Sequence, residues 1–133
     1  MRTAMRSVML TMLVLPLVVG TATAQQGEWV RLGQRAVTDR ADHDKIVVTG
    51  ARGDFKQIKF EVERGSVDFR RVVVHFASGD DQKLELRNTV PAGGETRAID
   101  LDGKDRVIQS VEFWYDANTR RGRQATVRLL GKR

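Results

Sequence analysis

Apolar and polar side chains alternate with a period of two in several short segments after residue 28. The clearest segments are residues 58–62, 84–86, 99–101, 111–115 and 125–129. In the first of them, charged side chains separate Ile58, Phe60 and Val62. Successive side chains of a β-strand point to opposite faces, so this alternation predicts strands with one buried and one solvated face.

Residues 67–76 form a longer apolar segment in which the alternation changes phase. Val67 and Phe69 have one parity, whereas Val72 and Val74 have the other. One extra residue in a strand restores the inward direction of the side chains that follow it. The pattern therefore predicts a β-bulge near Arg70-Arg71. Two further strands are expected at residues 29–32 and 45–49, the second because it is rich in β-branched side chains.

Glycine and aspartate punctuate these segments, and no segment shows a helical stripe. Gly79-Asp80-Asp81, for example, is typical of a hairpin turn. Short strands with frequent turns predict a single antiparallel β-sandwich, jelly-roll-like, of about eight strands. The predicted core is Trp29, Leu32, Ile46, Val48, Phe55, Ile58, Phe60, Val62, Phe69, Val72, Val74, Phe76, Leu84, Leu86, Ile99, Leu101, Ile108, Val111, Phe113, Tyr115, Val127 and Leu129.

The first 24 residues have the order of a secretory signal. Arg2 and Arg6 precede an apolar run at residues 8–19, and small residues surround Ala24. The run is shorter than the roughly 20 residues that span a bilayer. We expect cleavage after Ala24, a single domain at residues 25–133 without a membrane span, and a periplasmic or secreted location.

Composition limits the chemistry that this domain can perform. The chain has no cysteine, which excludes disulfides, thiolate metal sites and thiol catalysis. The formal net charge is +6, of which two units lie in the leader. The rest of the chain has a mild excess of basic over acidic residues, and the two kinds are interspersed. This charge distribution does not indicate nucleic-acid binding. His43 and His75 are the only histidines, and no serine lies in a nucleophile-elbow sequence.

Three aspartates, Asp39, Asp42 and Asp44, lie close together around His43 and before an expected strand. Closely spaced carboxylates in a loop can bind Ca²⁺, which prefers oxygen ligands. The segment does not match the helix–loop–helix calcium motif and lacks its closing glutamate. The alternative is a solvated turn in which Asp44 pairs with an arginine. Ca²⁺ is the only cofactor that this sequence suggests.

The segment from residue 117 to the end contains six basic side chains and no acidic one. Trp114 precedes it with a parity opposite to that of the predicted core. An exposed tryptophan beside Arg120, Arg121 and Arg123 could stack on a sugar ring or bind an anionic polymer. The alternative is a basic hairpin whose arginines pair with neighbouring acids while Trp114 covers a sheet edge.

The order of landmarks along the chain resembles a group of small exported bacterial all-β proteins of unknown function. The matching segments are EWVRLG at 28–33, DHDKI at 42–46, GDFKQI at 53–58, GGETR at 93–97, IDL at 99–101, RVI at 106–108 and VEFWY at 111–115. The resemblance implies a bacterial envelope or secreted setting. It transfers no activity, ligand or site residue.

Together these observations favour an exported binding or interaction module without catalytic activity. Its partner would be a glycan, an anionic envelope polymer or another protein. One alternative is a structural domain stabilised by Ca²⁺. Another is a small hydrolase that uses paired carboxylates, for which so short a domain leaves little material to form a cleft.

Overall fold

The computed structural model describes residues 28–38, 41–51, 53–118 and 124–133. The expected leader therefore lies outside the described residues. The described residues form nine β-strands and no helix, and so contain no helix long and apolar enough to cross a membrane.

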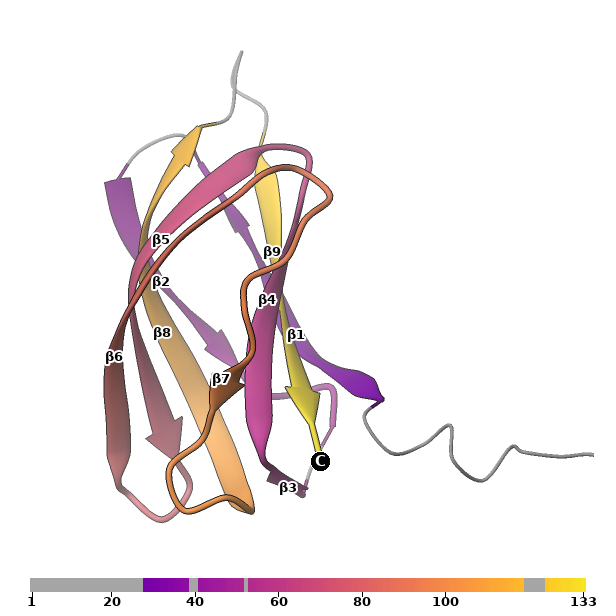
Figure 1. Cartoon of the computed structure of the whole chain (residues 1–133), viewed down its shortest axis with the longest axis vertical. Coiled ribbons are helices and arrows are strands. Elements are labelled where there is room, and N and C mark those ends of the chain that lie inside the picture. Colours follow the sequence, from indigo (N-terminus) through magenta and orange to yellow (C-terminus); the bar gives the residue numbers. More distant parts are fainter. Residues whose placement is uncertain (1–27, 39–40, 52, 119–123) are drawn as a thin grey trace, which may run out of the picture.

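The strands form two antiparallel sheets that pack face to face (Figure 1). Sheet I has the order β1 (Trp29–Val37), β9 (Ala125–Lys132), β4 (Gln57–Glu63) and β7 (Ile99–Asp100). Sheet II has the order β2 (Ala41–Val47), β8 (Arg106–Asn118), β5 (Ser66–Phe76) and β6 (Asp81–Val90). The short strand β3 (Asp54–Phe55) pairs with the start of β8.

The strand pairs are nested from the ends of the domain inward. β1 pairs with β9, β2 with β8, β4 with β7, and β5 with β6. This nesting places sequence neighbours such as β1 and β2 in opposite sheets. It is the eight-stranded jelly-roll arrangement, with β3 added, and it confirms the predicted fold.

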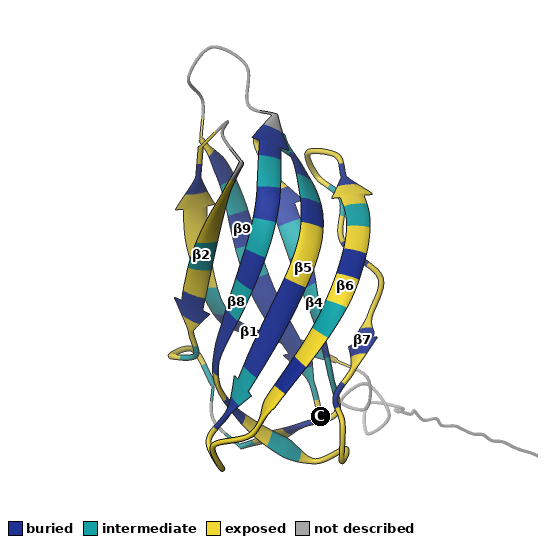
Figure 2. Cartoon of the chain, turned by 90° about the vertical axis from the view of Figure 1, so that its left-hand side faces the viewer, coloured by how far each residue is buried: buried dark blue, intermediate teal, exposed yellow. Residues whose placement is uncertain are grey.

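The core lies between the two sheets and is built from the inward parity of each strand. Phe60 of sheet I stacks on Phe69 of sheet II with ring centroids 4.9 Å apart, and Phe113 lies 5.4 Å from Phe60. In Figure 2, buried and less buried residues alternate along β8, as one-sided burial requires. Most of the predicted core is buried, and Val48 and Leu84 are partly buried against it. Trp29 is the exception: its register partner is Lys132, and it is only partly buried, on the outer face of sheet I.

The phase change in β5 is a β-bulge, as the sequence predicts. Both the β5–β8 and the β5–β6 registers shift between Phe69 and Arg71. After the shift, Val72 and Val74 point inward and are fully buried. The bulge has a second consequence, because it sets Arg71, Val73 and His75 on the outer face of sheet II.

Candidate functional site

The outer face of sheet II carries a connected group of polar and aromatic side chains. β8 runs between β2 and β5, and its outward residues include Glu112 and Trp114. Register places Trp114 opposite His43 on one side and Arg71 on the other. The next row of register partners across the four strands consists of Lys45, Glu112, Val73 and Lys83.

Trp114 is held between two side chains, a group that we call the Arg71–Trp114–His43 ladder. The imidazole of His43 stacks on the indole with centroids 4.5 Å apart and an interplanar angle of 16°. The Arg71 guanidinium carbon lies 4.1 Å from the indole centroid. Because β2 and β5 flank β8 from opposite sides, the two contacts cover opposite faces of the ring. Stacking and cation–π attraction therefore fix all three side chains.

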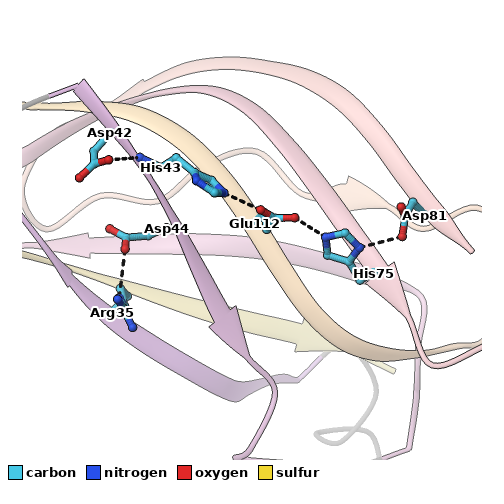
Figure 3. Close-up of polar contacts among 7 residues, drawn as sticks. All are labelled: Arg35, Asp42, His43, Asp44, His75, Asp81 and Glu112. Carbon is cyan, nitrogen blue, oxygen red and sulfur yellow. Dashed lines mark hydrogen bonds and ion pairs between the residues drawn. The ribbon is translucent and has the colours of Figure 1, made fainter. Parts of the chain in front are cut away.

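A chain of hydrogen bonds crosses all four main strands of sheet II beside this ladder (Figure 3). His43 Nε2 lies 2.5 Å from Glu112 Oε2, and His75 Nε2 lies 2.5 Å from Glu112 Oε1. His75 Nδ1 lies 2.7 Å from Asp81 Oδ1. We call this group the histidine–carboxylate chain. It connects β2, β8, β5 and β6 through their side chains.

The geometry favours one protonation state of His75. An ionised carboxylate only accepts hydrogen bonds, and both ring nitrogens of His75 face one. With both carboxylates acting as acceptors, both nitrogens donate, and this arrangement favours the imidazolium form of the ring. The hydrogen bond to Glu112 raises the pKa of His75, against the opposing effect of its partial burial, and Asp81 raises the pKa further. Hydrogen bonds from His75 and then His43 lower the pKa of Glu112.

An apolar side chain lies beneath these polar groups. Val73 is on the outer face between Arg71 and His75, yet only 5% of it is exposed. The surrounding side chains therefore exclude water from the middle of the face. Partial exclusion of water strengthens the ionic hydrogen bonds of Glu112, whose side chain is 19% exposed.

A shallow hollow lies at the β2 side of the ladder. Its lining residues are Asp42, His43, Arg70, Trp114 and Tyr115. Arg70 is exposed and pairs with Asp116. The hollow thus has aromatic side chains and a guanidinium group in its lining.

The two described aspartates of the predicted Ca²⁺ site, Asp42 and Asp44, both have hydrogen-bond partners within the protein. Asp44 accepts hydrogen bonds from Arg35 Nε at 3.2 Å and from the Tyr115 hydroxyl at 2.7 Å. Asp42 Oδ1 accepts from the backbone amide of His43 at 2.8 Å, and Asp39 lies outside the described residues. Within the described ranges, no three His, Asp or Glu side chains are arranged to hold a metal ion. The arginine partner foreseen for Asp44 is present, but residues 42–44 belong to strand β2 and not to the expected loop or turn, because they pair with residues 113–115 of β8.

The predicted ligand site is described only in part. Trp114 lies on the outer face, as its parity predicts, but His43 and Arg71 cover its ring faces. Arg120, Arg121 and Arg123 lie outside the described residues, just after β8 ends at Asn118. Sequence reasoning did not assign Arg71, His75 and Glu112 to a site. Their outward parity was visible, but their proximity depends on strand order.

A second hollow lies where β4, β7 and β9 come together. Lys56, Lys104, Lys132 and Arg133 line it, but so do Asp100 and Asp102. Lys56 is bound to Asp105 at 3.0 Å. The mixed charge of this wall gives no preference for one class of ligand.

The fold and this face define a jelly-roll protein with a rigid aromatic and charged surface on one sheet. Residues 7–131 match a family model described as a domain of unknown function, DUF2541. The chain therefore belongs to the DUF2541 family. No curated protein matches it.

Two solved structures are similar to the chain. One is Pseudomonas aeruginosa AlgX, with 14% identity, a TM-score of 0.48 and coverage of 84% of this chain and 29% of AlgX. The other is from infectious bursal disease virus, strain Gx, with 13% identity, a TM-score of 0.35 and coverage of 78% of this chain and 30% of the viral chain. The chain spans less than a third of each, and neither likeness bears on function.

Proposed function

We propose that this protein is an exported, non-catalytic module that binds an anionic polymer across the outer face of sheet II. The observation that carries the proposal is the Arg71–Trp114–His43 ladder, in which a guanidinium group is fixed on an aromatic ring at the surface. Planar guanidinium groups bind carboxylates and phosphates with two parallel hydrogen bonds.

The ladder supports binding because it is ordered before a ligand arrives. Arg71 is exposed, yet its contact with Trp114 restricts the rotamers of a long side chain. Less side-chain entropy is then lost when Arg71 contacts an anion. The ring of Trp114 acts as the support of Arg71, in place of the sugar platform that the sequence suggested.

The distribution of charge favours an extended ligand over a small ion. Lys45 and Lys83 are exposed at opposite ends of the row that contains Glu112. These two residues are three strand spacings apart, or about 14 Å at roughly 4.8 Å per spacing. Together with Arg71 they offer separate cationic points along the face, which suits a chain with repeated carboxylate or phosphate groups.

The state of the carboxylates supports a non-catalytic role. A carboxyl group that acts as a general acid needs a raised pKa. The hydrogen bonds from the two histidines lower the pKa of Glu112, and Asp81 is bound to His75. Both side chains are therefore engaged as hydrogen-bond acceptors.

The proposal that the protein is exported is based on the leader at residues 1–24, and it can be tested separately. Mass spectrometry of the protein recovered from a bacterial host should find Gln25 as the N-terminal residue. An intact Met1 in the recovered protein would refute this part of the proposal.

Binding can be tested by isothermal titration with polygalacturonate as the anionic polymer and dextran as the neutral one. We expect binding only to polygalacturonate, with an affinity that falls as salt is added. Arg71→Gln should weaken binding at least threefold. Arg31→Gln removes the same charge from an exposed residue of β1 in the other sheet, and it should leave the affinity unchanged.

Three results would contradict the proposal. The first is equal binding of dextran and polygalacturonate, and the second is no binding of either. The third is an equal loss of affinity in Arg71→Gln and Arg31→Gln, because this would mean that net charge, and not the ladder, determines binding.

A further inference from the structure

We propose that His75 makes anionic-polymer binding depend on pH, so that the face of sheet II binds more tightly when the ring is an imidazolium. The inference rests on the proposed function and adds its regulation. The observation behind the inference is that the His75 ring lies between two carboxylates from different strands.

The two carboxylates leave His75 no neutral arrangement that satisfies both. Asp81 comes from β6 and Glu112 from β8, and both approach within hydrogen-bond distance of ring nitrogens. A neutral imidazole has one N–H and one lone pair. After loss of a proton, one nitrogen would direct its lone pair at a carboxylate oxygen, and that carboxylate would lose its partner.

Glu112 transmits this change to the ladder. Its second oxygen accepts from His43 Nε2, and His43 is the side chain stacked on Trp114. When His75 is neutral, the negative charge of Glu112 is no longer offset on the β5 side. A carboxylate whose only remaining imidazole partner is His43 and whose charge is less offset then lies next to Trp114 and Arg71, where it repels an anionic ligand.

Among the described residues, Glu112 and Asp81 are the charged groups bonded directly to His75, and His43 binds the other oxygen of Glu112. From β8, His75 meets Glu112 and its register partner Ser110, and from β6 it meets Asp81. On the same outer face, Lys83 follows Asp81 along β6 and Arg71 precedes His75 along β5. Both are exposed side chains, and Arg71 is already held on Trp114. His75 therefore decides the local charge balance.

The direction of the effect follows from charge. Loss of the His75 proton removes one positive charge from the outer face of sheet II, on which the polymer is proposed to bind. At low ionic strength, a charge change of this kind alters affinity by about threefold to tenfold. Binding should therefore weaken as the pH rises through the raised pKa of His75.

Two measurements test the inference on the full-length mature protein. The first follows the ring nitrogen signals of His75 by NMR, which distinguish imidazolium from imidazole. We expect a doubly protonated ring at pH 7. The second measures polygalacturonate affinity from pH 5.5 to 8.5, a range in which the uronate carboxylates stay ionised. We expect a threefold to tenfold decrease across this range.

Two variants assign the pH dependence to His75. His75→Gln should bind polygalacturonate with an affinity that no longer changes at the pH where His75 titrates. Asp81→Asn removes one carboxylate partner and should move the transition to lower pH while keeping it. Because Asp81→Asn retains the ring, it keeps the test decisive if His75→Gln fails to fold.

The results separate this inference from the proposed function. Binding with the same pH profile in the wild type and His75→Gln would overturn the regulation alone. A neutral His75 ring at pH 7 would also overturn it. Absence of polygalacturonate binding at every pH would overturn the proposed function, and with it the regulation.

Discussion

The hydroxyl of Tyr115 donates a 2.7 Å hydrogen bond to Asp44, and this bond holds the edge strand β2 against β8 from the inner side of sheet II. Arg35 of β1 binds the other oxygen of Asp44, so the same carboxylate joins the two sheets. The aspartate that suggested a Ca²⁺ ligand is thus a structural link.

Tyr115→Phe should lower the free energy of unfolding by about 1–2 kcal/mol, because a hydrogen bond to a charged acceptor is lost while Arg35 remains. Urea unfolding measures this change. In an Asp44→Ala background the same substitution should have a much smaller effect, since its partner is already absent. Additive losses in the double variant would show that Tyr115 does not act through Asp44.

Tyr115 should also resist ionisation. Burial, followed by the bond to Asp44, raises the pKa of its hydroxyl above the ordinary value of 10.0. Because the folded-state pKa is the higher one, this contribution to stability is complete below pH 10 and is lost as the pH rises further. Tyr115 is the only tyrosine, so tyrosinate absorbance reports on it alone. The absorbance should rise only with unfolding, and a normal titration near pH 10 would contradict the buried position.

Phe113 joins the aromatic side chains of both sheets and is fully buried. Phe113→Ala should lower the free energy of unfolding by about 3–5 kcal/mol, because it leaves a cavity in the core. Val47→Ala, at a residue that is 56% exposed, should change it by less than about 0.5 kcal/mol. Similar losses in the two variants would contradict the position of the core.

Gly131 allows β9 to pass close to two core side chains. A Cβ at this position would lie 2.8 Å from Leu32 Cδ1 and 2.8 Å from Phe55 Cδ1. Gly131→Ala should therefore destabilise the protein by about 1–3 kcal/mol through overpacking. Thr126→Ala on the outward side of the same strand is the control, with an expected change below about 1 kcal/mol. Unchanged thermal stability of Gly131→Ala would show that the Leu32 and Phe55 side chains can move aside without penalty.

The His75–Glu112 pair predicts an optimum of stability in mild acid. The pKa of His75 is raised, so its contribution is complete below its ordinary value of 6.5 and is lost as the pH rises through the folded-state pKa. The pKa of Glu112 is lowered, so its contribution is present above its ordinary value of 4.5 and is lost as the pH falls. Urea unfolding at pH 5.5 and 8.5 should show greater stability at pH 5.5. His75→Gln should reduce this difference, and an unchanged difference would assign it to other groups.

The alternation of side chains was sufficient to predict most of the strands, their inner and outer faces and the bulge at Arg70-Arg71. It missed the second half of β1 and the start of β2, where residues 42–44 were expected in a loop. Trp29 was placed wrongly, because a large aromatic side chain on an outer face cannot be recognised from its identity. Its ring lies 4.3 Å from the Lys59 ammonium, which reaches it from β4 in the same sheet. Only the pairing of both β1 and β4 with β9 brings these two residues near each other.

The sequence by itself determined the face of most side chains in the regularly alternating strands, because that choice depends on the geometry of adjacent residues. The tertiary structure decided which strands are neighbours, and this placed β8 between β2 and β5. His43, His75 and Glu112 are far apart along the chain. The backbone hydrogen bonds that pair strands do not depend on which side chains the strands carry, so strand order cannot be read from these residues. The histidine–carboxylate chain exists only because the nested strand order brings the three side chains to one surface.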